Sequence, residues 1–137
     1  MIEKRLSELN INDTFFDSFR EDYYEFNNWF YKNKDRVCYV TYDKDKIVSL
    51  LVLKIEGNIL KVSTMKVINT GKGIGTKYIE IINRYKEDNK LDNVYITVYE
   101  KYNILIEFLI KNGFKKYGYK DTLNGKNKLD KELVLWI

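Results

Sequence analysis

NTGKGIGTKY, residues 69–78, holds three of the seven glycines of this 137-residue chain, at every second position. A helical pattern begins directly after them. Glycine destabilises a helix and has no side chain to bury, so the cluster needs a reason. The first turn of a helix carries free N–H groups and a partial positive charge, and glycines let an oxyanion approach the backbone. The segment therefore predicts a phosphate-binding turn. A flexible tight turn is the alternative, although one glycine would suffice for it.

The segments on either side of the glycines predict a parallel pair of strands. Residues 47–55 and 59–67 are apolar, and the EGN between them predicts a tight hairpin turn. After the glycines comes an amphipathic helix, and residues 93–99 then alternate between aliphatic and Tyr or Thr side chains, as a strand does. Because a helix of crossover length joins 59–67 to 93–99, we expect these two strands to be parallel neighbours.

The remaining segments complete the expected fold. Nine aromatic residues in 15–31 indicate an amphipathic helix, or a broken pair of helices, with Asn12 as its cap. Further strands are expected at 2–6, 36–42, 114–120 and 131–137, and a second apolar helix at 102–112. The inward positions of that helix are Leu105, Ile106, Leu109 and Ile110. Residues 1–137 are thus expected to form one α/β (α+β) domain, with a mixed, mostly antiparallel sheet, a central parallel strand pair and helices on both faces.

The composition argues against several classes of site. The chain contains no histidine, which removes histidine-based triads and makes a zinc or iron site improbable, so we expect no metal. Cys38 is the single cysteine and lies in an apolar strand, which favours a buried, inert thiol over a nucleophile. No apolar run approaches the roughly 20 residues that span a bilayer, and the N-terminus has no apolar signal core. We therefore expect a cytoplasmic protein that does not bind membranes.

The charge distribution is uneven although the net charge is only +4. Seven lysines and two acids fall in 111–131, whereas eight acids and five bases fall in 1–35. Solvated surface is the simpler explanation of both patches. A nucleic-acid-associated domain that uses 111–131 is a separate hypothesis, and we regard nucleic acid as an improbable partner.

Two common phosphate motifs fail on spacing. A P-loop needs Gly-Lys-Ser/Thr, whereas Gly75 is followed by Thr76 and Lys77, and the dinucleotide motif lacks its third glycine or alanine. TGKGIG instead resembles motif A of the GNAT superfamily of N-acetyltransferases, in which Gln or Arg, two residues, Gly, one residue and Gly or Ala follow a strand. Thr70, Gly73 and Gly75 match these places, with Thr70 where the motif prefers Gln or Arg. IKNGF, residues 110–114, resembles motif B.

This resemblance implies an acetyl-CoA site. The pyrophosphate would bind the amides of the glycine turn, and the pantetheine arm would pair with the end of strand 59–67, where it diverges from 93–99. A backbone amide there could also hold the oxyanion of the tetrahedral intermediate. The implied binding residues are Met65, Lys66, Val67, Gly71, Lys72, Gly73, Ile74, Gly75, Thr76 and Asn103. The implied activity is transfer of an acetyl group from acetyl-CoA to a primary amine by direct attack in a ternary complex.

The catalytic groups are less clearly marked. The superfamily often has a tyrosine, as the acid that protonates the departing thiolate, where this chain has Leu109. Tyr102 is a substitute, as are Tyr117 and Tyr119, and Glu100 is the candidate base. The missing tyrosine leaves a non-catalytic CoA- or acyl-CoA-binding or sensing module as the alternative.

The acceptor is expected to be a small-molecule or peptide amine. The acids Glu21, Asp22 and Glu25 lie in the aromatic segment, which forms the acceptor side in the superfamily, and would favour a cationic amine. The state of assembly is expected to be a monomer or a homodimer, in which an edge strand containing LVLWI (133–137) could pair between chains.

Overall fold

The computed structural model describes residues 1–68, 70–120 and 132–137. In chain order, the elements are β1 (Ile2–Arg5), the 3₁₀ turns η1 (Leu6–Glu8) and η2 (Thr14–Phe16), α1 (Asp17–Asp22), α2 (Phe26–Lys32), β2 (Val37–Asp43), β3 (Lys46–Glu56), β4 (Ile59–Val67), α3 (Ile74–Asp88), β5 (Asn93–Tyr99), α4 (Asn103–Lys111), β6 (Lys115–Lys120) and β7 (Glu132–Trp136). Residues 121–131, which include part of the lysine-rich stretch, lie outside the described residues.

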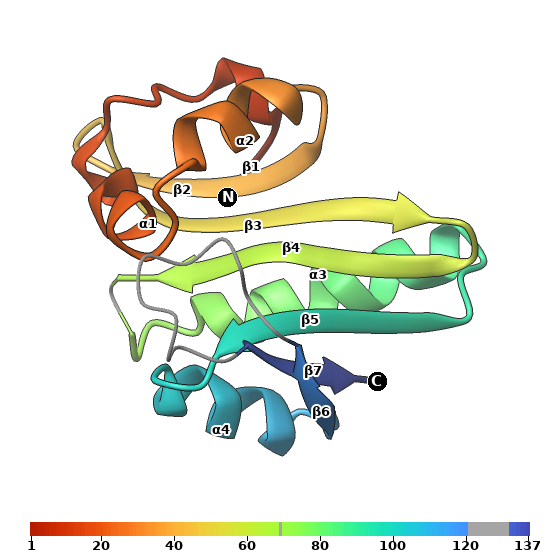
Figure 1. Ribbon diagram of the computed structural model, residues 1–137. Coiled ribbons are helices and arrows are strands. Elements are labelled where there is room, and N and C mark those ends of the chain that lie inside the picture. Colours follow the sequence, from red (N-terminus) through yellow and green to blue (C-terminus); the bar gives the residue numbers. More distant parts are fainter. Residues whose placement is uncertain (69, 121–131) are drawn as a thin grey trace.

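All seven described strands form one sheet in the order β1-β2-β3-β4-β5-β7-β6. β4 and β5 pair in parallel, and the other neighbouring strands in the described part of the chain pair antiparallel. β3, β4 and β5 run across the middle of the molecule (Figure 1). The predicted mixed sheet with a central parallel pair is confirmed.

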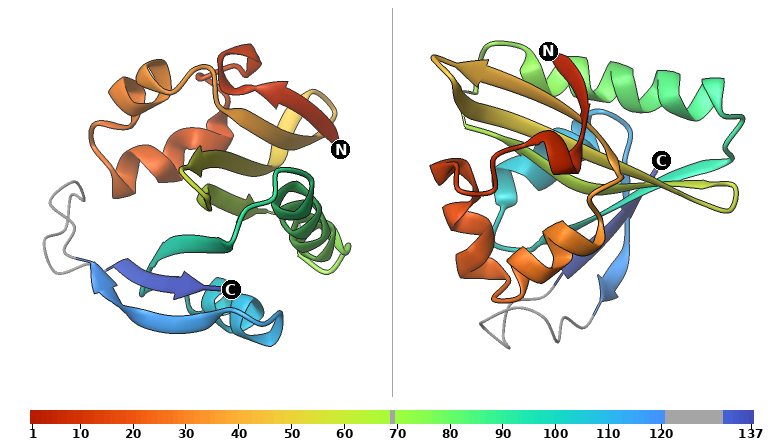
Figure 2. Two further views of the ribbon diagram at one scale, coloured as in Figure 1. Left: turned by 90° about the vertical axis from the view of Figure 1, so that its right-hand side faces the viewer. Right: turned by 90° about the horizontal axis from the view of Figure 1, so that it is seen from above.

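Helices cover both faces of this sheet, as expected (Figure 2). We call them the α3/α4 face and the α1/α2 face. Tyr78 and Ile82 of α3 and Leu109 of α4 pack in one core cluster with Leu60 and Val62 of β4. The second cluster lies on the α1/α2 face, against β2 and β3, and is rich in phenylalanine. Its buried members are Leu6, Leu9, Phe15, Phe16, Phe26, Phe30, Cys38, Val40, Ile47, Leu50 and Val52.

The aromatic segment forms the broken pair of helices rather than one helix. α1 ends because Tyr23 has an extended backbone, with φ −136° and ψ 100°, and α2 begins three residues later. The predicted cap was one residue off. Asp13, not Asn12, caps the first turn, and its carboxylate accepts a hydrogen bond from Phe15 N at 2.9 Å. The backbone N–H of Asn12 donates a hydrogen bond to Oδ1 of Asn10.

The prediction of edge strands near the C-terminus holds for β6 and is wrong for β7, which contains LVLWI. β7 lies between β5 and β6, and both of its neighbours pair with it along their length. Leu133 and Leu135 are buried as a result. The two edges of the described sheet are β1 and β6, so LVLWI does not offer a free edge for pairing between chains. In the described residues, no helix has the length and apolar character needed to cross a membrane.

Candidate functional site

β4 and β5 separate halfway along their length. Their parallel pairing covers four residue pairs, from Ile59 with Asn93 to Val62 with Ile96, although β4 continues to Val67 and β5 to Tyr99. The separation coincides with a bulge in β4. Val62 pairs with Leu53 and Thr64 with Val52, which leaves Ser63 as an extra residue. A bulge bends its strand and strengthens its twist, so Ser63 explains why β4 leaves β5 here.

The bulge leaves backbone groups of β4 facing the gap. Ile68 N donates to Val48 O on β3 at 2.8 Å, and hydrogen-bonding residues alternate in an antiparallel ladder. Residues 66 and 64 therefore also face β3, whereas the N–H and C=O groups of Met65 and Val67 face the side that β5 has left. Two of the three β4 residues predicted to bind a ligand thus have backbone groups that face the gap.

Lys66, the third of these residues, is directed elsewhere. Its backbone faces β3, and its ammonium group is hydrogen-bonded to Ser18 and lies 5.2 Å and 5.0 Å from the ring centres of Phe15 and Phe19. Burial lowers the pKa of Lys66, and the nearby Asp22 and Glu21 oppose that shift. The Lys66 side chain therefore belongs to the α1/α2 face rather than to the gap.

The glycine turn at the end of β4 uses its glycines in two ways. Gly71 and Gly73 have φ values of 86° and 75°, in the left-handed region that strongly favours glycine. Gly73 is the N-cap of α3, and its carbonyl accepts the hydrogen bond of Lys77 N at 3.1 Å. The N–H groups of residues 74–76 precede that bond and have no partner within the helix. Among the described residues, apart from chain neighbours, no atom lies within 4 Å of a Cβ built on Gly71 or Gly73, so both glycines border open space.

Gly75 is needed for close packing, which the sequence reading missed. A Cβ at this position would lie 3.0 Å from Cζ of Phe108 on α4. The predicted inner face of that helix included Ile110, but Ile110 is 42% exposed and Phe108 packs inward instead. The third glycine therefore brings the first turn of α3 against α4.

The turn between β5 and α4 carries the predicted catalytic residues and Asn103. Glu100 is exposed, Tyr102 is the N-cap residue of α4, and Asn103 is exposed in the first turn of that helix. The Tyr102 hydroxyl donates to the carboxylate of Asp22 on α1, and Lys101 forms a salt bridge with the same carboxylate. The turn is thus tied to α1, and the Asp22 charge is already paired.

Leu109, which stands where the superfamily often has a tyrosine, packs in the core. Leu109 is fully buried in the core of the α3/α4 face. Cys38 is also fully buried, and burial raises the pKa of its thiol to about 12. The thiol is therefore protonated near neutral pH, as the prediction of an inert cysteine requires. No group of three or more acids or cysteines in the described residues is arranged to hold a metal ion.

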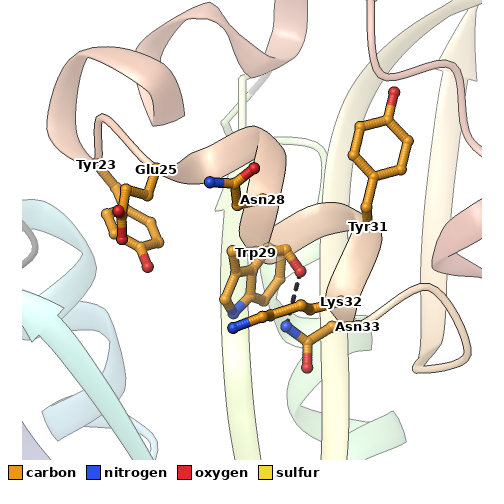
Figure 3. A pocket seen from close by; sticks show the side chains of 7 residues that line it. All are labelled: Tyr23, Glu25, Asn28, Trp29, Tyr31, Lys32 and Asn33. Carbon is orange, nitrogen blue, oxygen red and sulfur yellow. Dashed lines mark hydrogen bonds between the residues drawn. The ribbon is translucent and has the colours of Figure 1, made fainter.

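An open hollow of about 610 Å³ lies along α2 on the other side of the sheet. Its lining residues are Tyr23, Glu25, Asn28, Trp29, Tyr31, Lys32 and Asn33 (Figure 3). The Arg36 guanidinium lies 5.4 Å from the Trp29 ring centre, and Arg36 Nη1 donates to Ser63 Oγ at 2.7 Å. Arg36 thus links Trp29, which lines the hollow, to the bulge of β4. The sequence reading did not mark Arg36, because it joins residues that are far apart in the chain.

Comparison with known proteins identifies the fold. No protein-family model matches the sequence, and no curated protein matches it. Among solved structures, nourseothricin acetyltransferase matches with a TM-score of 0.67 and 17% identity, over 75% of this chain and 65% of that one. The IAA acetyltransferase from Bacillus cereus ATCC 14579 matches with a TM-score of 0.71 and 11% identity, over 99% and 97% of the two chains. A GNAT family acetyltransferase from Elizabethkingia anophelis with acetyl-CoA bound matches with a TM-score of 0.64 and 12% identity, over 82% and 81%.

The chain therefore has the fold of the GNAT superfamily of N-acetyltransferases. It spans about two thirds of the nourseothricin acetyltransferase, 65% of that chain. At these identities the likeness concerns the fold, and the activity is argued separately below.

Proposed function

We propose that the protein is an acetyl-CoA-dependent N-acetyltransferase that acts on a primary amine. The observation that carries this proposal is the divergence of β4 from β5 at Ser63, which turns backbone groups of Met65 and Val67 toward a gap beside the glycine turn. A pantetheine arm has amides that can pair with such strand groups, and its pyrophosphate fits the N–H groups at the start of α3. Two further observations support it: the open space at Gly71 and Gly73, and the fold shared with acetyl-CoA complexes.

The chemistry is a direct transfer within a ternary complex. A neutral amine nitrogen bonds to the thioester carbonyl carbon, the carbon–sulfur bond breaks, and the proton released by the amine balances the thiolate that leaves. An N–H group of β4 in the gap would stabilise the oxyanion that develops on the carbonyl. Cys38 is fully buried, so an acyl-enzyme through this thiol is not part of the proposal.

The turn after β5 supplies the proposed proton-transfer groups. Glu100 would accept the amine proton directly or through water, and Tyr102 would protonate the thiolate. Asn103, in the first turn of α4, would contact the pantetheine arm. Glu100→Gln should lower kcat if the carboxylate is the base, and Tyr102→Phe should lower it if the hydroxyl is the acid. Unchanged kcat values would remove these roles.

A CoA-binding or sensing module without turnover is the second candidate. The buried Leu109 favours it, since this place lacks the tyrosine that often acts as the acid in the superfamily. Binding of acetyl-CoA without transfer to any member of a broad amine panel would support this candidate over the enzyme.

Calorimetry with acetyl-CoA tests the site itself. The wild-type protein should bind, and Gly73→Val should weaken binding at least about tenfold, since a β-branched residue disfavours φ 75° and the N-cap geometry would change. Gly57→Val is the matched control. Gly57 also has positive φ, 60°, and open space around it, but it lies in the turn before β4 at the far end of the strand.

The control variant should lose a similar amount of stability and keep the wild-type affinity. Failure of the folded wild-type protein to bind acetyl-CoA would overturn the proposed function. Equal weakening by both valine variants would show that the glycine turn has no specific part in binding.

A further inference from the structure

Two half-buried cations lie on the α1/α2 face of β4, next to the bulge. Lys61 stands between Leu60 and Val62, which both face the opposite core, so its side chain points to the α1/α2 face. Its Nζ lies 5.9 Å from the ring centre of Tyr95, its partner on β5. Arg36 reaches the same face from the start of β2 and donates to Ser63 Oγ at 2.7 Å.

These two cations have little compensation. Within the described residues, neither has a carboxylate oxygen within 4 Å. Burial lowers the pKa of both groups, and Glu56 is the carboxylate that opposes this for each. Glu56 in turn accepts a hydrogen bond from the Tyr95 hydroxyl at 2.8 Å. Lys120 and Lys54 add further positive charge around Lys61. Among the described residues, positive charge is therefore in excess around this pair, and partly desolvated cations gain most from a bound anion.

Arg36 and Lys61 lie close to the part of β4 at which the proposed acetyl transfer would occur. Ser63, which Arg36 contacts, is the residue at which β4 leaves β5, and Lys61 is two residues earlier. A two-residue step along a strand is roughly 7 Å. A group held by Arg36 and Lys61 therefore lies within the length of one small molecule from the backbone of Met65. Trp29, which lines the open hollow along α2, lies against Arg36.

We propose that the amine acceptor carries an oxyanion, a carboxylate or a phosphate, which Arg36 and Lys61 bind while the amine reaches the gap between β4 and β5. This inference rests on the proposed function. Arginine suits the role because its planar guanidinium can donate two parallel hydrogen bonds to either kind of oxyanion. Of the acids that suggested a cationic acceptor, Asp22 is paired with Lys101 and Tyr102. Among the described residues, the charge left without a paired carboxylate beside the bulge is positive.

The test is acetyl transfer from acetyl-CoA to matched amines. The panel contains β-alanine and phosphoethanolamine with their neutral counterparts propylamine and ethanolamine, and longer chains built in the same way. One anionic series should exceed its neutral counterparts at least about tenfold in kcat/KM, and which series does so identifies the oxyanion. Arg36→Met and Lys61→Met should each reduce this preference at least about fivefold, mainly through KM for the anionic amine.

Lys111→Met is the control. Lys111 is an exposed lysine at the end of α4, which packs on the opposite face of the sheet, so its loss should leave the preference unchanged. The ratio of anionic to neutral substrates is the readout, because a variant that is merely less stable lowers both rates together. Acetyl-CoA binding is measured for every variant by calorimetry.

Three outcomes would overturn the inference. Wild-type protein that transfers to neutral amines as well as to anionic ones would end it while leaving the proposed function intact. A preference that survives in both Arg36→Met and Lys61→Met would assign the oxyanion to other residues. Absence of acetyl-CoA binding by the wild-type protein would remove the proposed function, and this inference with it.

Discussion

The two faces of the sheet are covered by different kinds of structure. On the α3/α4 face, one helix of 15 residues and one of nine pack on β4 and β5, and the polar groups form a closed set of hydrogen bonds. Ser49 Oγ lies 2.5 Å from both Thr41 Oγ1 and the Tyr78 hydroxyl, and that hydroxyl donates to Tyr39 O at 3.1 Å. On the α1/α2 face, helices of six and seven residues cover mainly β2 and β3 with phenylalanine rings, and half-buried cations lie beside them.

The two halves of the proposed site are built from different parts of the chain. The cofactor side depends on the backbone: positive φ values, free N–H groups and a strand that leaves its neighbour. The acceptor side depends on side chains that come from separate elements. Substitutions on the two faces should therefore affect stability and acetyl-CoA affinity in different proportions.

Phe16→Ala should have the largest effect on stability. Phe16 is fully buried, and its ring contacts those of Phe15, Phe19, Phe26 and Phe30 at centre distances of 5.4 to 5.8 Å. Its removal should lower the free energy of unfolding by about 3–5 kcal/mol in urea denaturation. Tyr24→Ala, at a residue that is 60% exposed, should change it by less than about 0.5 kcal/mol. The remaining folded Phe16→Ala protein should bind acetyl-CoA with wild-type affinity, and weaker binding would contradict the separation of the two faces.

Tyr78→Phe should have an intermediate effect that depends on pH. Near neutral pH, loss of the hydroxyl removes its hydrogen bonds with Tyr39 O and Ser49 Oγ and should cost about 1–2 kcal/mol. Burial raises the pKa of Tyr78 to about 12, against an ordinary value of about 10. Between these values the unfolded state ionises and the folded state does not, so this group's stabilisation falls as pH rises.

The phenylalanine variant has no such group, so its difference from wild type should shrink between about pH 10 and 12. Urea denaturation at several pH values measures the effect, and Tyr31→Phe, at an exposed residue, is the control. A difference that stays constant with pH would mean that Tyr78 ionises equally in both states.

Gly75→Ala should have the smallest effect. The added methyl group meets the Phe108 ring at 3.0 Å, which should cost about 1–3 kcal/mol, while alanine recovers about 1 kcal/mol of helix stability. A net loss of about 1 kcal/mol is expected. Phe108→Leu should relieve the contact in the double variant, and additive effects of the two substitutions would refute the proposed packing.

Sequence reading succeeded where a local pattern decides the structure. The parallel pairing of β4 and β5 follows from one crossover helix, and the inert Cys38 follows from its apolar strand. That Met65 and Val67 bind a ligand stays a prediction, although their backbone groups face the gap between the strands.

The sequence did not predict contacts between side chains that are far apart along the chain. Arg36 and Ser63 are 27 residues apart, and Asp22 and Tyr102 are 80 apart, and each residue alone looks like ordinary polar surface. The position of β7 was missed for a related reason. A closing hairpin can place either of its strands next to β5, and the local sequence pattern is the same in both cases.

The single extra residue Ser63 accounts for the gap between β4 and β5. Leu60, Val62 and Met65 all belong to the core of the α3/α4 face, although Val62 and Met65 are three residues apart. A β4 without Ser63 would keep these three residues on the same side in regular alternation, so its backbone could stay hydrogen-bonded to β5 up to Lys66, opposite Tyr99. Such a protein would have the more complete hydrogen-bond ladder and would lack the gap on which the proposed function rests. The gap therefore costs the sheet several hydrogen bonds, through the insertion of a single residue.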